Sequence, residues 1–181
     1  MKSYDYVHRL GVRRISWNDF ASLSARLVEL LEPFHPQLIL GIARAGLFPA
    51  TAVACSLRIE LFPIRLTRRL NDVVVHELPV WKVPVPNDVA GKVVAIIDEI
   101  ADTGKTLAMV ADRSSALGAA QVVTASLVTH SWANPAPQIS PLVSDEFIIF
   151  PWDRRVLAGG KWTKHPEVEA GLQAQRRNLK I

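Results

Sequence analysis

The residues best suited to chemistry lie together between positions 98 and 106, in the stretch DEIADTGKT. Two adjacent acids, Asp98 and Glu99, can accept hydrogen bonds from hydroxyl groups or bind a metal ion. The segment 102–106 then leads into a predicted helix over residues 107–117. The first backbone N–H groups of a helix have no helical partner, so they favour an anion. A ligand that suits both parts carries a phosphate at one end and hydroxyl groups nearby, as a sugar phosphate does.

The element that must position these acids is the apolar run of residues 93–97, which is typical of a buried parallel strand. A nucleoside-triphosphate P-loop is the nearest rival, because Gly104-Lys105-Thr106 resembles the end of that motif. The P-loop needs a glycine five positions before Gly104, and this chain has Glu99 there. Two adjacent acids would also repel a triphosphate, so the sequence argues against a P-loop.

The same stretch resembles the signature of type I phosphoribosyltransferases that binds 5-phosphoribosyl 1-diphosphate (PRPP). That signature is an apolar strand, two acids, two apolar residues and Asp-Thr-Gly-x-Thr. The residues in register are Asp98, Glu99, Asp102, Thr103, Gly104 and Thr106, with Lys105 in the variable position as in hypoxanthine-guanine enzymes. The resemblance implies that Asp98 and Glu99 hold the ribose hydroxyls and Mg²⁺. It also implies that residues 102–106 bind the 5′-phosphate and that Asp102 is the catalytic acid or base. A solvated acidic loop without a ligand is the structural alternative.

A second strand-to-helix turn, residues 43–46, lies between a predicted strand over 37–42 and a predicted helix over 47–57. Open α/β sheets bind ligands at the carboxyl ends of such strands. The turn resembles the pyrophosphate loop of the same family, which implies a catalytic and pyrophosphate-binding role for Arg44. By the same resemblance, Ala45 and Gly46 bind pyrophosphate and the Ala43–Arg44 peptide is cis. Ala45 replaces a family glycine, and it would restrict the backbone if φ is positive. A surface arginine is the alternative for Arg44.

A strand predicted over residues 60–66 is followed by Arg68 and Arg69 and by short predicted strands over 73–75 and 80–83. Family members carry a mobile flap in this place, here about 67–87. The resemblance implies that the two arginines contact phosphate from that flap. A solvated basic hairpin is the alternative for these residues.

A strand predicted over residues 121–128 precedes a segment that resembles the base-binding hood of xanthine-guanine enzymes, here about 130–160. On that register Phe147 stacks on the purine, the Ile148 backbone meets the edge of the base, and Asp153 helps to hold Mg²⁺. His130 stands where these enzymes have a lysine that donates to the 6-oxo group, and neutral histidine has one ring donor. The alternatives are a core aromatic residue for Phe147 and no role for His130.

The composition indicates a globular α/β protein with one domain, residues 1–181: 49% of the residues are hydrophobic, and no apolar run is long enough to span a membrane. A helix is predicted over 16–31, with Ser16 as its cap and Asp19 in support, and a short helix over 166–175. The single cysteine, Cys55, fits a packed thiol in a reducing cytoplasm. The net charge of +4 favours an anionic partner.

The resemblance thus implies a doubly wound, mostly parallel sheet of the type I phosphoribosyltransferase fold. It also implies transfer from PRPP to a purine base, a 6-oxopurine, with Mg²⁺ as cofactor, in cytoplasmic purine salvage by a homodimer. One alternative is a PRPP-sensing regulator that binds nucleic acid, which the pairs Arg68-Arg69 and Arg176-Arg177 motivate. No helix-turn-helix pattern supports that alternative. The second alternative is transfer from PRPP to an acceptor other than a purine.

Overall fold

The computed structural model describes residues 9, 11–67, 69–70, 73–76 and 79–178. Its contacts divide the chain into two compact units. The central unit is Leu23–Ser144, and the terminal unit combines Met1–Ser22 with Asp145–Ile181. Each unit is described by itself.

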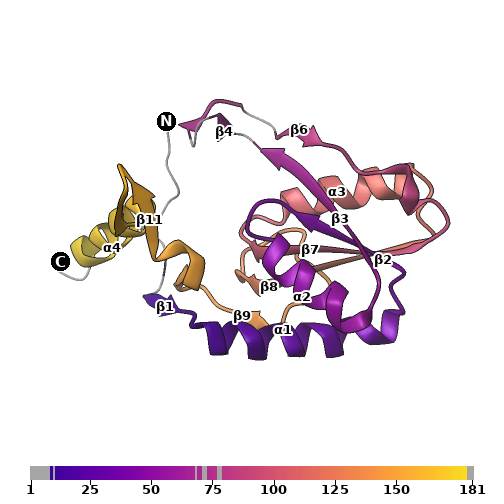
Figure 1. Ribbon diagram of the computed structural model, residues 1–181, viewed down its shortest axis with the longest axis horizontal. Coiled ribbons are helices and arrows are strands. Elements are labelled where there is room, and N and C mark those ends of the chain that lie inside the picture. Colours follow the sequence, from indigo (N-terminus) through magenta and orange to yellow (C-terminus); the bar gives the residue numbers. More distant parts are fainter. Residues whose placement is uncertain (1–8, 10, 68, 71–72, 77–78, 179–181) are drawn as a thin grey trace. The chain divides into compact units, whose positions relative to one another are not determined.

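The central unit is built on a six-stranded sheet with the order β6-β3-β2-β7-β8-β9 (Figure 1). All neighbouring pairs are parallel except β3 with β6. The strands are β2 (Leu38–Ile42), β3 (Glu60–Thr67), β6 (Val80–Val83), β7 (Val93–Ala101), β8 (Gln121–Thr129) and β9 (Leu142–Val143). The chain moves one way from β2 to β3 and the other way from β7 to β8. The predicted doubly wound sheet is therefore confirmed.

Two helices cover opposite faces of this sheet, α2 (Leu47–Leu57) and α3 (Lys105–Ala116). Side chains alternate along β2: Leu40 belongs to the apolar cluster that contains Val110 of α3, whereas a methyl group on Gly41 would lie 2.8 Å from Ala50 of α2. Figure 1 shows the strands passing between the two helices. The strands β2 and β7 are buried from both sides, which explains why they are continuous apolar runs.

Most predicted elements are confirmed, and the largest difference is at β7. The sequence predicts that this strand ends at Ile97, yet β7 continues to Ala101 because its ladder with β8 pairs Asp98 with Ser126 and Ala101 with Thr129. The acid pair thus lies within a strand. The remaining connections are the 3-10 helices η1 (Glu32–Phe34) and η2 (Asn87–Val89), and a small hairpin of β4 (Arg69–Leu70) and β5 (Val73–Val74) in the predicted flap.

The terminal unit contains small sheets and helical turns. Its elements are β1 (Val12–Arg14), β10 (Phe147–Ile149), η3 (Pro151–Asp153), β11 (Arg155–Ala158), β12 (Lys161–Lys164) and α4 (Pro166–Asn178). The parallel pair β1–β10 and the hairpin β11–β12 are not apparent from the sequence. Helix α1 (Trp17–Leu31) begins here and continues in the central unit. Its predicted cap is confirmed, because Ser16 Oγ accepts from the Asp19 N–H at 3.1 Å.

No helix in the described part of the chain is both long and apolar enough to cross a membrane.

Candidate functional site

Both predicted ligand loops lie at the same edge of the central sheet. The strands β2 and β7 are parallel neighbours, with Leu38 opposite Val94 and Gly41 opposite Ile97, so their carboxyl ends meet. The connections from these two strands run in opposite directions, which makes this the switch point where open α/β sheets bind ligands. The contact that joins the loops is direct: a methyl group on Gly46 would lie 2.8 Å from Asp98 Oδ1.

The acid pair is held in place by the sheet. Asp98 Oδ1 accepts a hydrogen bond from the Glu99 backbone N–H at 2.9 Å, and both side chains are half-buried. Burial raises the pKa of Asp98 above its usual value. Burial, followed by repulsion from Asp98, raises the pKa of Glu99 well above its usual value. A cation, or hydroxyl donors from a ligand, would relieve both effects.

The donor set of this pair fits Mg²⁺, which prefers carboxylate oxygens and is usually bound by one or two carboxylates together with substrate phosphates. Within the described residues no group of three or more His, Cys, Asp or Glu side chains is placed to hold a metal ion. An ion at Asp98 and Glu99 would therefore need oxygen atoms from a ligand as well.

The pyrophosphate loop follows β2. The Ala43–Arg44 peptide bond is cis, as predicted, and the Arg44 side chain is exposed. Among the described residues other than glycine, positive φ occurs at His35 and Arg58, so Ala45 has an ordinary backbone conformation. Gly46 also has an ordinary φ of −61°. The loop therefore accepts Ala45 without backbone strain and requires Gly46 for its close approach to the acids.

The phosphate loop follows β7 and opens α3, whose cap is Gly104 with φ of +76°. A methyl group on Gly104 would overlap the carbonyl oxygen of Pro135. The Asn134 N–H donates to the Thr103 carbonyl at 3.1 Å. The segment after β8, which the sequence describes only as irregular, thus packs against the back of this loop. The exposed Thr103 and Lys105 lie on the loop itself.

Trp132 is a residue of this site that sequence reasoning misses. Its Nε1–H donates to Asp102 Oδ1 at 3.2 Å, and its ring stacks on His130 with the centroids 4.5 Å apart. The donation fixes one carboxylate oxygen of the residue that is predicted to handle the proton of the base. The only available signal is a tryptophan three residues after the end of β8, the strand that neighbours β7.

His130 is 1% exposed, and its Nδ1 lies 2.6 Å from the Ser144 carbonyl oxygen. Because a carbonyl only accepts, Nδ1 carries the proton in this pair. In the neutral ring Nε2 is then an acceptor. The predicted donation from His130 to a 6-oxo group would therefore need a doubly protonated ring.

The predicted hood residues lie in the terminal unit. Phe147 and Ile148 are buried at 9% and 8% exposure. The ladder with β1 uses the Phe147 N–H, which donates to Gly11, and the Ile149 carbonyl, which accepts from Ile15. Alternate residues of a strand face opposite neighbours, so the backbone groups of Ile148 point away from β1. Asp153 is half-buried in η3. The roles of all three toward a base or Mg²⁺ stay predictions.

Arg68 lies outside the described residues, and for Arg69 the description is limited to its backbone in β4. Their predicted contacts with phosphate therefore stay predictions.

Comparison with known families gives one decisive match: the model of the phosphoribosyl transferase domain matches residues 14–158. The chain belongs to this family. A purine phosphoribosyltransferase from Pyrococcus horikoshii Ot3 is 30% identical, with 79% of this chain and 94% of that chain covered and a TM-score of 0.71. Comparison with curated proteins gives no match.

Two further solved structures share the phosphoribosyltransferase fold at lower identity. A xanthine-guanine-hypoxanthine phosphoribosyltransferase from Helicobacter pylori is 19% identical, with 80% of this chain and 93% of that chain covered and a TM-score of 0.67. A Neisseria gonorrhoeae hypothetical protein with bound ppGpp is 19% identical, with 91% of this chain and 97% of that chain covered and a TM-score of 0.57.

Proposed function

We propose that this protein is a purine phosphoribosyltransferase, which transfers the 5-phosphoribosyl group of PRPP to a purine base and releases pyrophosphate. The observation that carries the proposal is the close approach of Gly46 to Asp98, because it brings the pyrophosphate loop against the acid pair. A ligand that spans both loops needs a phosphate, vicinal hydroxyls and a pyrophosphate on one small framework. PRPP has all three. The similarity to a purine enzyme supports a purine as the acceptor.

In the proposed reaction the C1–O bond to pyrophosphate breaks while a purine nitrogen forms a bond to C1. The transition state resembles an oxocarbenium ion, as in glycoside cleavage. Asp98 and Glu99 accept hydrogen bonds from the ribose hydroxyls, and their negative charge favours the developing cation. Arg44 binds the departing pyrophosphate through charge-assisted hydrogen bonds. Mg²⁺, held by the acid pair together with ligand oxygens, supplies further charge neutralisation when it is bound.

The 5′-phosphate rests on the phosphate loop, bound by backbone N–H groups at the start of α3 and by the hydroxyls of Thr103 and Thr106. Asp102 accepts the proton of the attacking purine. The Trp132 indole N–H orients the Asp102 carboxylate. The flap, about 67–87, closes over the site and keeps water from the cation.

The direct test is turnover by the purified protein with PRPP, Mg²⁺ and one base at a time: hypoxanthine, guanine, xanthine, adenine, uracil and orotate. We expect a nucleoside monophosphate and pyrophosphate in equal amounts from at least one purine. Adenine is the informative comparison, because the neutral ring of the buried His130 uses its one N–H on the Ser144 carbonyl and so cannot donate to a 6-oxo group. Formation of no nucleotide from any base would refute the proposal, and binding of PRPP without turnover would favour a regulator.

A further inference from the structure

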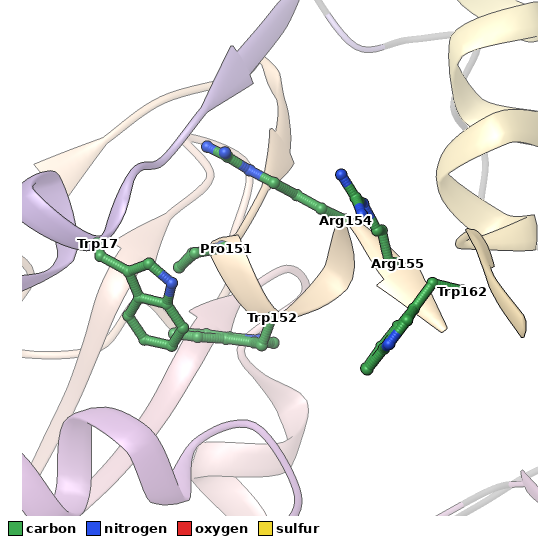
Figure 2. A pocket seen from close by; sticks show the side chains of 6 residues that line it. All are labelled: Trp17, Pro151, Trp152, Arg154, Arg155 and Trp162. Carbon is green, nitrogen blue, oxygen red and sulfur yellow. The ribbon is translucent and has the colours of Figure 1, made fainter. Parts of the chain in front are cut away.

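The terminal unit contains a cavity of about 390 Å³, and none of its lining residues is assigned an individual role in the transfer reaction, although four of them belong to the predicted hood. The lining residues are Trp17, Pro151, Trp152, Arg154, Arg155 and Trp162 (Figure 2). The volume lies in the range of pockets that hold small ligands, about 300–1,000 Å³. The match to the family domain ends at residue 158, so Trp162 lies beyond it.

One wall of the cavity is a fixed aromatic surface. The rings of Trp17 and Trp152 have centroids 6.0 Å apart, and Trp152 stacks on Phe150 at 4.8 Å with the planes 7° apart. Phe20 meets Trp152 edge to face at 5.4 Å. Because several rings hold Trp152, its plane is set before any ligand arrives. Figure 2 shows Trp162 across the cavity from Trp152.

Trp162 forms the other wall and is 67% exposed, on the β11–β12 hairpin. A large aromatic side chain that stays in water loses the free energy that burial of its apolar surface would give. Exposed aromatic residues are therefore common where a ligand or partner covers them. The hairpin register pairs Leu157 with Trp162 and Arg155 with Lys164. Cross-strand partners and alternate residues share a face. Two cations therefore stand on the same face as the exposed indole.

The segment that approaches and forms the β11–β12 hairpin is basic, and Asp19 is an acid close to Arg154. From Arg154 to Lys164 the sequence RRVLAGGKWTK contains four cations and no acid. Arg154 is fixed at the cavity by a hydrogen bond to the Ile15 carbonyl at 3.1 Å, and Arg155 is exposed beside it. Guanidinium groups next to aromatic faces suit a ligand that combines a planar ring with phosphate.

We propose that this cavity, the tryptophan cavity, is a second ligand site that binds a nucleoside phosphate, with its base between Trp152 and Trp162 and its phosphate at Arg154 and Arg155. The cavity has one pair of aromatic walls, which suits a single base. A nucleic acid strand would instead need a row of stacking surfaces along a basic groove. The tryptophan cavity and the loops that are predicted to bind PRPP have no residue in common.

The test is calorimetric titration of the full chain with GMP and with AMP, in the presence of saturating PRPP and Mg²⁺ to occupy the proposed transferase site. We expect Trp162→Ala to weaken nucleotide binding about tenfold through lost stacking, and Arg155→Gln to weaken it about fivefold. The matched controls are Thr163→Ala and Lys161→Gln, because both residues lie on the other face of the hairpin and neither lines the cavity. Both controls should bind within twofold of the parent protein.

Guanosine lacks the phosphate and ribose 5-phosphate lacks the base, so each should bind at least tenfold more weakly than GMP. Turnover of PRPP should be the same in the variants at positions 161–163, which lie outside the predicted hood, so failure of this proposal is distinct from failure of the proposed function. Equal nucleotide affinity in the parent and in both cavity variants would overturn the assignment, and so would absence of GMP and AMP binding. A single-stranded oligonucleotide that binds a hundredfold more tightly than GMP, dependent on Trp162, would overturn it in favour of a nucleic-acid surface.

Discussion

The pyrophosphate loop and the phosphate loop follow neighbouring strands of one sheet, and each contains a glycine that cannot be replaced, for different physical reasons. Gly46 has an ordinary φ of −61°, but a methyl group there would lie 2.5 Å from the Ile42 carbonyl oxygen and 2.8 Å from Asp98 Oδ1. Gly104 has φ of +76°, and a methyl group there would overlap the Pro135 carbonyl. Gly46 is required because neighbouring atoms leave no room for a methyl group. Gly104 is required for the same reason and also because its φ is positive.

This difference shows what holds each loop. The pyrophosphate loop packs closely at Gly46 against the end of β2 and against Asp98. The phosphate loop is positioned from behind by the segment after β8, through Asn134 and Pro135. A change at one loop should therefore disturb the acids, and a change at the other should disturb the start of α3.

The largest effect is expected for Gly104→Ala. The left-handed conformation costs an L-residue about 1–2 kcal/mol, and overpacking adds about 1–3 kcal/mol, so urea unfolding should show a loss of about 3 kcal/mol. The control is Gly118→Ala, where φ is +87° but the nearest atom to an added methyl group is 3.9 Å away. Equal destabilisation of the two variants would show that contact with Pro135 does not hold the phosphate loop.

Gly46→Ala should reduce turnover about a hundredfold, because displacement of a reacting group by about an ångström is enough to cost that factor. The expected loss of stability is about 2 kcal/mol from overpacking. Gly41→Ala is the control, since its methyl group would meet Ala50 and Leu47 at 2.8 Å and not the acids. If the control loses as much turnover as Gly46→Ala, the contact with Asp98 has no special role.

Trp132→Phe should lower kcat about fivefold and leave KM for PRPP unchanged. The substitution removes the donor to Asp102 and keeps an aromatic ring against His130, and one hydrogen bond is worth about 1 kcal/mol. Steady-state kinetics measure the split, with Trp162→Phe on the exposed hairpin as the control. An equal change in KM and kcat would mean that Trp132 supports the whole loop and does not orient the carboxylate alone.

The smallest effect is expected for Ala45→Gly. Ala45 has an ordinary backbone conformation, so restoring the family's glycine relieves no strain. Stability should fall by about 0.4–1 kcal/mol through greater freedom of the unfolded chain, and turnover should stay within twofold. A tenfold gain in turnover would show that Ala45 restrains the loop.

Much of the fold follows from local patterns. Apolar runs buried on both faces are easy to recognise, and the helices α1 and α2 and the strands β2 and β8 lie close to their predicted bounds. Strand β7 ends four residues after its predicted end, because the polar residues at 98 and 99 indicate a turn. The backbone at these positions nevertheless belongs to the ladder with β8. Pairing with a neighbouring strand cannot be predicted from the local sequence.

The loops of the site could be located from the sequence, but the contacts that hold them could not. Trp132 meets Asp102 across thirty positions, and Gly104 meets Pro135 across a similar distance in sequence. The parallel pairing of β1 with β10 joins the two ends of the chain. Such contacts depend on the path of the chain in space, so no local pattern reveals them.

The most direct measurement is calorimetric titration of PRPP with Mg²⁺ into the Asp98→Asn/Glu99→Gln variant. The matched control is Asp88→Asn/Glu60→Gln, which makes the same two chemical changes at exposed positions before β7 and at the start of β3. Because burial raises the pKa of both site acids, their ionisation lowers stability at neutral pH, and the variant should be at least as stable as the parent. We predict a loss of at least about a hundredfold in PRPP affinity for the site variant and none for the control. Equal affinity of the two variants for PRPP would contradict binding at the carboxyl ends of β2 and β7.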